Sequence, residues 1–459
     1  MAVFIPAHEQ SEFHALKAAA DWLVKATDPV DSERSKFEEA FVSNYKEREG
    51  EPPAVNVSEM FDLLLSHNTW AFQFLANEEA KAGEAGGTQS HFGRDIKAEA
   101  FSHVEAYFTV LMDLLQRLDE KESEGRLAKL IEVLKGEGKG GLSDLRMRLL
   151  MYLFNSLEGG LHPASKASRV KVLTEVLSFA LKNKRFGDVE QYAEGLSEYL
   201  NFVGASEKEK GKIYGILAEG FRLQGSMANR KRAFEFGKKQ MECFDILPVA
   251  ERKQVQKEAT ALIIDAVALP NNLSFDGVAD FAAVSDLRSA SGDAKAAIQL
   301  VDIFLEGAPA DLEAFYGKNK GLFETYKLDL EVCRRKIRLL SLTKSLQNQG
   351  QSDISLEELG KSLNAGSAEV EQWIVEAIGQ GLLDGRIDQL RGVIRVKQAF
   401  QRTFGQKEWE GLRDQVRGWI GNVRELLDVL EARRDERDGL TDAIERQAED
   451  DMQERDRRG

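Results

Sequence analysis

Apolar residues recur at intervals of three and four along most of the chain, which is the pattern of helices that bury one face. A helix beginning near Ser165 has its apolar face at Val170, Leu173 and Leu177, and "SEKE" (206–209) is a capping-box sequence that opens another. Predicted helix starts near 165, 206 and 249 repeat about every 42 residues, in the range of HEAT-like repeats. The pattern therefore predicts an all-α solenoid of right-handed, HEAT- or TPR-like helix pairs, each covering its neighbour's apolar face.

The pattern changes at "GLLDGRIDQLRGVIRV" (381–396), where two short β-branched runs flank the turn-like "DQLRG". These features predict a β-hairpin. Before it, the sequence predicts a helix over 328–347, a short strand or turn and a short helix over 353–363, and a helix over 367–381. Helix, helix, helix and hairpin is the order of a winged-helix subdomain, and the hairpin would be its wing because an isolated hairpin is not stable.

A long helix is predicted from residue 406, with apolar residues spaced alternately by three and four. This a/d seam is typical of a helix that packs in a bundle or coiled coil. The seam could instead fold back on the solenoid, but two tryptophans and an unbroken heptad pattern favour partner helices. After Leu430 the sequence is mostly charged, which predicts a frayed or disordered tail. The seam residues are Trp409, Leu412, Val416, Trp419, Val423, Leu426 and Leu430.

These patterns divide the chain into five parts. The glycine-rich "GEGKGG" (136–141) marks the first boundary as a hinge. The predicted parts are an N-terminal helical region (1–140), a helical-repeat array (141–350), a winged helix (351–404), a C-terminal bundle helix (405–431) and a charged, disordered tail (432–459).

Composition narrows the possible partners. The chain has 459 residues and a net charge of −15, whereas nucleic acids and anionic membranes attract clustered Lys and Arg. Two distant cysteines, Cys243 and Cys333, make no disulfide framework and fit a reducing compartment. The N-terminal "MAVFIPAHEQ" is not a signal peptide, and no run approaches the ~20 apolar residues of a spanning helix. We therefore expect a cytoplasmic protein with neither DNA nor a membrane as its partner.

Enzyme motifs are missing. "GEGKGG" matches G-x-G-x-x-G, but the preceding "LAKLIEVLK" is helical and no βαβ unit surrounds it, so a plain loop is the better interpretation. No P-loop or H-E-x-x-H motif occurs. His91 and His103 are the candidates for a shared site, but no Cys or carboxylate spacing supports a metal there. We expect no catalytic residue, no cofactor and no metal. The histidines are at positions 8, 14, 67, 91, 103 and 162.

Winged helices often bind DNA through their third helix. Here the third helix carries Glu369, Glu371 and Glu376 and no Lys or Arg, so phosphate would be repelled. The basic run "NRKR" (229–232) is interpreted as a solvated helix face. A minor RNA contact through this run or the wing stays open. The alternative use of a winged helix is protein binding, because the edge of its sheet can pair with a strand of another chain. The wing arginines are Arg386, Arg391 and Arg395, offset by Asp384 and Asp388.

Four stretches carry a resemblance to a known family. They are "KIRLLSL" (336–342), "DISLEEL" (353–359), "VEQWIVEAIGQGLLDGRIDQLRGVIRV" (370–396) and "RTFGQKEWEGLRDQVRGWIGNV" (402–423). With the helical array, the winged helix and the terminal helix, they resemble the PCI-domain family of the proteasome lid, the signalosome and translation initiation complexes. The junction "RTFG…W" is the most specific piece, and it is similar to PCI subunits of eukaryotic translation initiation factor three.

The resemblance implies a non-catalytic scaffold subunit of that initiation factor, with a PCI domain over about 230–404. The complex would bind the small ribosomal subunit and recruit mRNA during translation initiation. Family members pair through winged-helix edges, and their C-terminal helices gather with those of PCI and MPN subunits. Two alternatives remain: a PCI scaffold of the signalosome or proteasome lid, and a winged-helix nucleic-acid-binding module. The implied edge residues are Leu383, Ile387, Ile394 and Val396, and the implied bundle residues are those of the seam.

Overall fold

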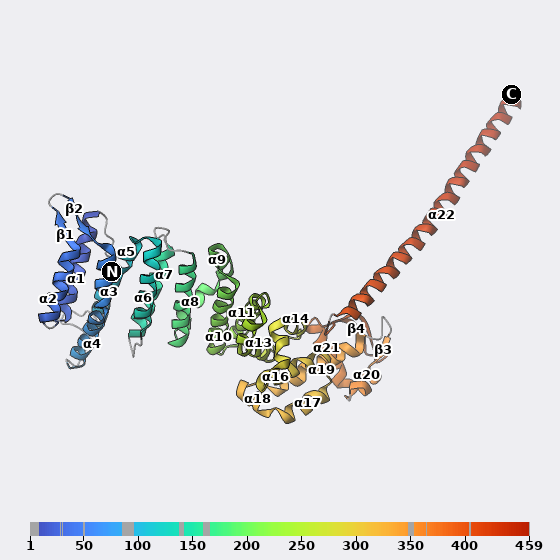
Figure 1. Cartoon of the computed structure of the whole chain (residues 1–459). Helices are drawn as coiled ribbons and strands as arrows, with labels where there is room; N and C mark the ends of the chain where they lie inside the picture. The colour runs from blue at the N-terminus through green and yellow to red at the C-terminus, as the bar shows by residue number, and fades with distance from the viewer. Residues whose placement is uncertain are drawn as a thin grey trace. The chain divides into compact units, whose positions relative to one another are not determined.

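A computed structural model describes residues 9–27, 29, 31–48, 51–84, 96–136, 142–158, 166–347, 353–363, 365–403 and 405–458. The chain forms two compact units, one of residues 1–269 with 281–295 and the other of residues 270–280 with 296–459. Helices dominate both units, as the sequence predicts (Figure 1). In the part of the chain that the structure describes, no helix is long and apolar enough to span a bilayer.

The first unit is an array of helices in which consecutive members lie side by side (Figure 1). A short antiparallel hairpin of β1 (Tyr45–Arg48) and β2 (Glu51–Val55) joins α2 to α3, and the sequence analysis did not predict it. The helices are α1 (Glu9–Thr27), α2 (Asp31–Asn44), α3 (Val57–Ser66), α4 (Asn68–Glu84), α5 (Ile96–Gln116), α6 (Glu120–Lys135), α7 (Leu142–Glu158), α8 (Lys166–Lys182), α9 (Leu196–Val203), α10 (Glu207–Gln224), α11 (Met227–Asp245), α12 (Val249–Arg252), α13 (Gln256–Ala268) and α15 (Ala282–Ser285).

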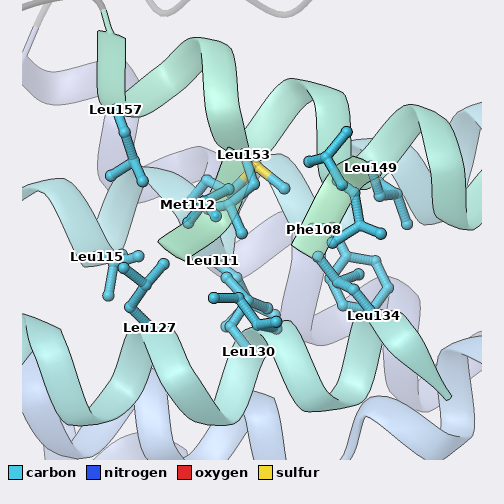
Figure 2. Close-up of a cluster of buried hydrophobic side chains, with 14 of the residues drawn as sticks. Phe108, Leu111, Met112, Leu115, Leu127, Leu130, Leu134, Leu149, Leu153 and Leu157 are labelled. Atoms are coloured by element: carbon cyan, nitrogen blue, oxygen red, sulfur yellow. The ribbon is translucent and has the colours of Figure 1, made fainter. Parts of the chain in front are cut away.

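One hydrophobic core runs through the array across the boundary expected near residue 140. Leu111 of α5, Leu130 of α6 and Leu149 of α7 are each fully buried in the same cluster. Figure 2 shows side chains of these three helices converging between the ribbons. Because helices before and after that position share one core, the structure draws no unit boundary there, and the units divide near residues 270–295 instead. Most of "GEGKGG", residues 137–141, lies outside the described residues.

The predicted repeat is visible as contacts between equivalent positions. The Ser206 side chain and Glu209 form the predicted capping box at the start of α10. After α8 the chain forms 3₁₀ turns at Phe186–Asp188 and Glu190–Ala193, and α9 begins only after Gly195, whose φ of 73° favours glycine. In the described part of the array, side-chain hydrogen bonds join four pairs of residues that lie 42 or 43 positions apart, about one repeat: Lys208–Glu251, Arg222–Asp265, Arg232–Glu190 and Lys239–Ser197.

A buried carboxylate lies at one of these contacts. Asp265 of α13 is fully buried, and Arg222 of α10 donates to its Oδ2 from Nε at 2.9 Å and from Nη2 at 2.7 Å. Arg230 Nε is 3.5 Å from Oδ1, too far to give that oxygen a good hydrogen bond. Burial raises the pKa of Asp265 although both arginines oppose it. Arg232 donates to Glu190, so two arginines of the run "NRKR" pair within the array rather than only facing solvent.

The second unit combines short helices with a small sheet. Its helix α14 is Asp276–Ala279 and its last helix, α22, is Gln406–Arg458. The predicted winged-helix order is confirmed: a helix, a short strand, two helices and a hairpin. The remaining elements are α16 (Asp293–Glu306, beginning in the first unit), α17 (Pro309–Lys318), α18 (Lys320–Tyr326), α19 (Leu330–Gln347), β3 (Asp353–Ser355), α20 (Leu356–Leu363), α21 (Ser367–Gly379), β4 (Leu383–Asp388) and β5 (Val393–Ala399).

The terminal helix is longer than the sequence pattern indicated. Helix α22 continues without a break through residues 432–458, where a frayed or disordered tail was expected (Figure 1). Glu, Arg, Gln and Ala in this segment are good helix formers even though they bury no core. Pairs one turn apart add to this, such as Arg433 with Glu436 (3.7 Å) and Arg434 with Asp438 (3.6 Å).

We predict that Arg222→Ala destabilises the first unit by about 3 kcal/mol, because it removes both hydrogen bonds from a buried carboxylate. Arg222→Lys should cost less, since it retains the charge. Hydrogen–deuterium exchange of α10, α11 and α13 measures the loss. Since the variant raises the pKa of Asp265 further, its extra cost should shrink as pH falls. Equal exchange in the wild type and the Ala variant would contradict a stabilising role for this contact.

We predict a pH-dependent stability of the second unit from Lys336 of α19. Its side chain is fully buried, its Nζ is 5.3 Å from the Phe275 ring centre, and burial lowers its pKa from 10.5 to about 7. Between those values the unfolded chain binds more protons, so the free energy of unfolding should rise with pH. Lys336→Met should flatten that rise and stabilise the unit below pH 7 by an amount on the order of 4 kcal/mol. Thermal unfolding from pH 6 to pH 10 measures both; identical pH profiles would contradict this.

Candidate protein-interaction surfaces

The winged helix is built on a three-stranded antiparallel sheet in the order β3-β5-β4. Ile354 of β3 and Ile387 of β4 both pair with Ile394 of β5, which places β5 in the centre. Helix α19 packs against α20, α21 and β5 to close the subdomain. The strands alternate buried and exposed residues, so one face of the sheet lies on the core and the other on solvent.

The wing turns where the sequence predicts it. Residues 389–392 connect β4 to β5, and the Asp388 Oδ1 atom accepts a hydrogen bond from the Arg391 backbone N–H at 3.2 Å. Gly392 has φ of 64°, and Gly381, which follows α21, has φ of 73°. Both glycines adopt the left-handed conformation that other residues avoid. The short side chain of Asp388 and these glycines therefore fix the hairpin register.

The four implied edge residues do not share one position. Ile394 and Val396 lie on the central strand β5 and are 0% and 5% exposed, so they belong to the subdomain core and not to an edge. Leu383 lies on the edge strand β4, but its side chain is also buried, at 3% exposed. Ile387 of β4 is partly exposed. The sequence places apolar residues on a wing but does not reveal which strand takes the central place, because β3 comes from a distant part of the sequence.

The two edges of the sheet differ. Strand β3 has three residues, and its Asp353 carboxylate accepts hydrogen bonds from Arg395 at 2.7 and 3.0 Å, which hold the pKa of Asp353 below its usual value. Strand β4 has six residues and a bulge between Asp384 and Gly385. A Cβ at Gly385 would lie 2.9 Å from the Arg395 carbonyl oxygen, so the strands approach too closely for a side chain. The longer edge, β4, is the better template for a partner strand.

Helix α21, the third helix of the winged helix, presents no cationic side chain. Glu376 pairs with Arg335 of α19, and Glu371 accepts a hydrogen bond from Gln389 of the wing turn. Glu369 is exposed, and so is Val375, at 59%. This face is acidic and partly apolar, which disfavours contact with phosphates.

A buried arginine connects the winged helix to α22. Arg402 is 6% exposed and donates to the Leu340 carbonyl oxygen (2.8 Å), the Gly307 carbonyl oxygen (2.9 Å) and the Ser341 Oγ atom (2.9 Å). Burial lowers its pKa to about 10. Beside it, the Phe400 carbonyl oxygen accepts a hydrogen bond from Gln347. These bonds hold the segment before α22 against α16 and α19.

Sequence reasoning used the "RTFG" junction as a family motif but gave Arg402 no role. A single arginine between Phe400 and Phe404, in a linker between two ordered elements, was the available signal. Its acceptors lie 61 to 95 residues earlier in the chain, so spacing could not identify them.

The seam residues of α22 are exposed, unlike the apolar faces of the first unit. At intervals of three and four on one helix they share one face. Ile420, Leu427 and Val429 flank that face and are 47%, 51% and 59% exposed, so the apolar stripe widens between 419 and 430. A stripe wider than a/d alone is typical of a helix in a bundle. The exposed fractions are 60% for Trp409, 40% for Leu412, 40% for Val416, 63% for Trp419, 54% for Val423, 63% for Leu426 and 64% for Leu430.

The titratable residues that could suggest chemistry have packing roles. His67 Nδ1 is 2.8 Å from the Leu63 carbonyl oxygen, and His103 stacks on Trp22 with ring centres 6.1 Å apart. The possible pairing of His103 with His91 lies outside the described residues. Among the described residues no group of three or more His, Cys, Asp or Glu side chains could hold a metal ion. Burial raises the thiol pKa of Cys243 and of Cys333 to about 12, so both are unreactive near neutral pH.

Comparison with known proteins identifies the class first. Residues 316–398 match the family model of the PCI domain. This range covers α19, β3, α20, α21 and β4 and most of β5, and it falls inside the 230–404 range predicted from sequence motifs. The winged-helix end of the chain is therefore similar to a PCI domain.

The chain is also similar along most of its length to one named subunit. It is 25% identical over 329 residues to eukaryotic translation initiation factor 3 subunit M of Dictyostelium discoideum, covering 72% of this chain and 79% of that protein. It is 25% identical to subunit M of Nematostella vectensis (72% and 83% covered) and 22% identical to that of Homo sapiens (71% and 83%). The resemblance to this subunit, to which the quoted motifs already pointed, is confirmed.

We predict that Arg402→Met destabilises the second unit by about 3 kcal/mol, because one buried and two partly buried acceptors lose their donor. Arg402→Lys should give an intermediate loss, since one ammonium cannot reach all three acceptors with the geometry of a guanidinium. Thermal unfolding followed by circular dichroism measures the change. A Met variant as stable as the wild type would show that the junction is held by other contacts.

Proposed function

We propose that this protein is a non-catalytic scaffold subunit of the eukaryotic translation initiation factor 3 complex. The observation that carries the proposal is a PCI winged helix followed by a helix with an exposed apolar seam, in a chain similar to subunit M. In this role it holds neighbouring subunits in position. Through the complex it acts in small-ribosomal-subunit binding and mRNA recruitment in the cytoplasm.

The seam supports the assembly role energetically. Burying one large apolar side chain contributes about 1.5–3 kcal/mol, and the seam exposes seven such residues within about six turns of one helix. Part of that gain offsets the entropy lost on association. A helix that exposes this apolar face to water therefore stabilises a complex in which other helices cover the face. We assign those helices to PCI and MPN subunits of the same complex.

The second proposed contact is the edge of strand β4. Its backbone groups can pair with a strand of a neighbouring PCI subunit, as in β-augmentation. Leu383 and Ile387 lie on this strand, and their role is to fix its position: Leu383 anchors β4 to the core and Ile387 is available at the surface. Ile394 and Val396 support the sheet from its centre.

The domain division follows from these roles. We propose that the helical-repeat array over residues 141–350, continuous with the N-terminal helical region 1–140, positions the subunit, and that residues 351–404 and 405–431 form its two contact regions. RNA contact is minor or absent, because α21 is acidic and Arg230 and Arg232 pair within the array. The relatives compared above carry the name of the initiation factor, which favours it over the signalosome and the proteasome lid.

We predict that Trp409→Asp or Trp419→Asp lowers recovery of the complex at least about tenfold, because a carboxylate in a desolvated seam is costly. The full-length tagged chain is purified from its own cells after RNase treatment, and co-purified PCI and MPN subunits are quantified by mass spectrometry. Gly421→Asp is the matched control, because it adds the same charge on the opposite face of α22 and should leave recovery unchanged.

The outcomes separate the alternatives. Recovery of initiation factor 3 subunits with the wild type and the control, but not with the Trp variants, supports the proposal. Recovery of signalosome or lid subunits instead would overturn the assigned function. Undiminished recovery when both tryptophans are changed would refute the role of the seam.

A further inference from the structure

The apolar seam of α22 does not end at Leu430. Leu440 and Ile444 lie two heptads after Leu426 and Leu430, in the same register. Because α22 is one continuous helix to Arg458, the register is preserved and these residues return to the same face. Leu440 is 65% exposed and Ile444 is 66% exposed, much like Leu430.

The heptad between these two apolar blocks carries arginines at both seam positions. Arg433 and Arg437 take the places of Leu426 and Leu430 one heptad later, and Arg434 lies next to them. Arg433 lies 3.7 Å from Glu436, and Arg437 lies 3.3 Å from Asp438, with both arginine side chains more than 70% exposed. Exposed pairs of this kind contribute little, so both guanidinium groups can turn to other carboxylates.

We propose that the docking seam of α22 extends from Trp409 to Ile444 and that its partner is a helix of another protein with Asp or Glu residues facing Arg433 and Arg437. This proposal rests on the proposed function and adds the chemistry of the partner. The partner helix presents apolar residues on both sides of an acidic heptad.

The acidic partner follows from desolvation. A helix that covers Leu430 on one side and Leu440 and Ile444 on the other must also cover the heptad between them. That removes water from Arg433 and Arg437, and a covered guanidinium without a carboxylate is strongly unfavourable. A polar pair within an apolar seam also fixes the register and selects the partner.

A second copy of this chain does not fit the seam. In a parallel pair of α22 helices, Arg433 would face Arg433 and Arg437 would face Arg437. In an antiparallel pair over the same segment, Arg433 would face Arg437. No seam position between 409 and 444 carries an acidic residue, and the flanking carboxylate of Glu436 already pairs with Arg433 of its own helix. Like charges therefore oppose self-association.

The glycines of α22 lie on the face away from the seam. Gly411, Gly418, Gly421 and Gly439 all lie outside the seam positions, and a Cβ at any of them would meet nothing within 4 Å. Each glycine lowers helix stability by about 1 kcal/mol relative to alanine. The helix therefore carries its weak positions on the outer face and gains stability when a partner covers the seam.

Crosslinking in the assembled complex tests the contact. Arg433→Lys and Arg437→Lys are introduced singly into the full chain, and the purified complex is treated with a carbodiimide, which joins an amine to a carboxylate that touches it. We expect crosslinks from both lysines to Asp or Glu of one partner helix. Arg424→Lys and Arg446→Lys, outside the seam on the same helix, are the controls and should give no such crosslink.

Charge reversal tests the energetic role. Arg433→Glu with Arg437→Glu should lower recovery of the partner at least about tenfold, because carboxylates would face carboxylates. Arg424→Glu with Arg446→Glu changes the net charge equally and should leave recovery unchanged. Equal loss in both double variants would point to a general charge effect and overturn the proposal.

The two proposals fail in different ways. If Trp419→Asp abolishes recovery but the Arg433 and Arg437 variants neither crosslink nor weaken binding, the seam ends at Leu430 and only the extension is wrong. If Trp419→Asp has no effect, the scaffold role of the seam is wrong as well. Crosslinks between two copies of this chain would replace the acidic partner with self-association.

Discussion

The structure depends on one constraint: a helix pair of this chain cannot bury its own apolar face. In the first unit the next pair supplies the cover, so the core passes from α5 to α6 and α7 without a break. Polar contacts at a separation of 42 or 43 residues, such as Arg222 with Asp265, join equivalent positions of successive pairs. Because stability in such an array comes from neighbours, every helix without a neighbour exposes a face that another molecule can use.

Buried polar groups fix the arrangement where apolar packing alone would allow alternatives. Asp265 joins helices of the array, and Arg402 joins the segment before α22 to α16 and α19. Asp265 accepts two hydrogen bonds and Arg402 donates three, and a covered charge without such partners would be costly. Arg402 also fixes the position of the segment from which the terminal helix begins.

The terminal helix is subject to the same constraint, but its apolar face is exposed. Its seam has the spacing of a packed helix, yet its apolar residues are exposed, and the same register returns after two arginines at Leu440 and Ile444. The winged helix shows the reverse case. Its apolar wing residues are mostly buried, and the group it offers to a partner is the backbone edge of β4. Of the two proposed contacts, one would thus be made by side chains and the other by the main chain.

The sequence by itself determined the elements whose cause is local. Periodicity predicted the helices, "SEKE" predicted the capping box at Ser206, and the glycines and Asp388 predicted the wing turn, since each depends on neighbours within one or two turns. Only the tertiary structure decided that β5 is the central strand, which places Ile394 and Val396 in the core and not at an edge. It also decided that Arg402 is buried and donates hydrogen bonds to distant acceptors. Those outcomes depend on contacts between segments far apart in the chain, which no local pattern encodes.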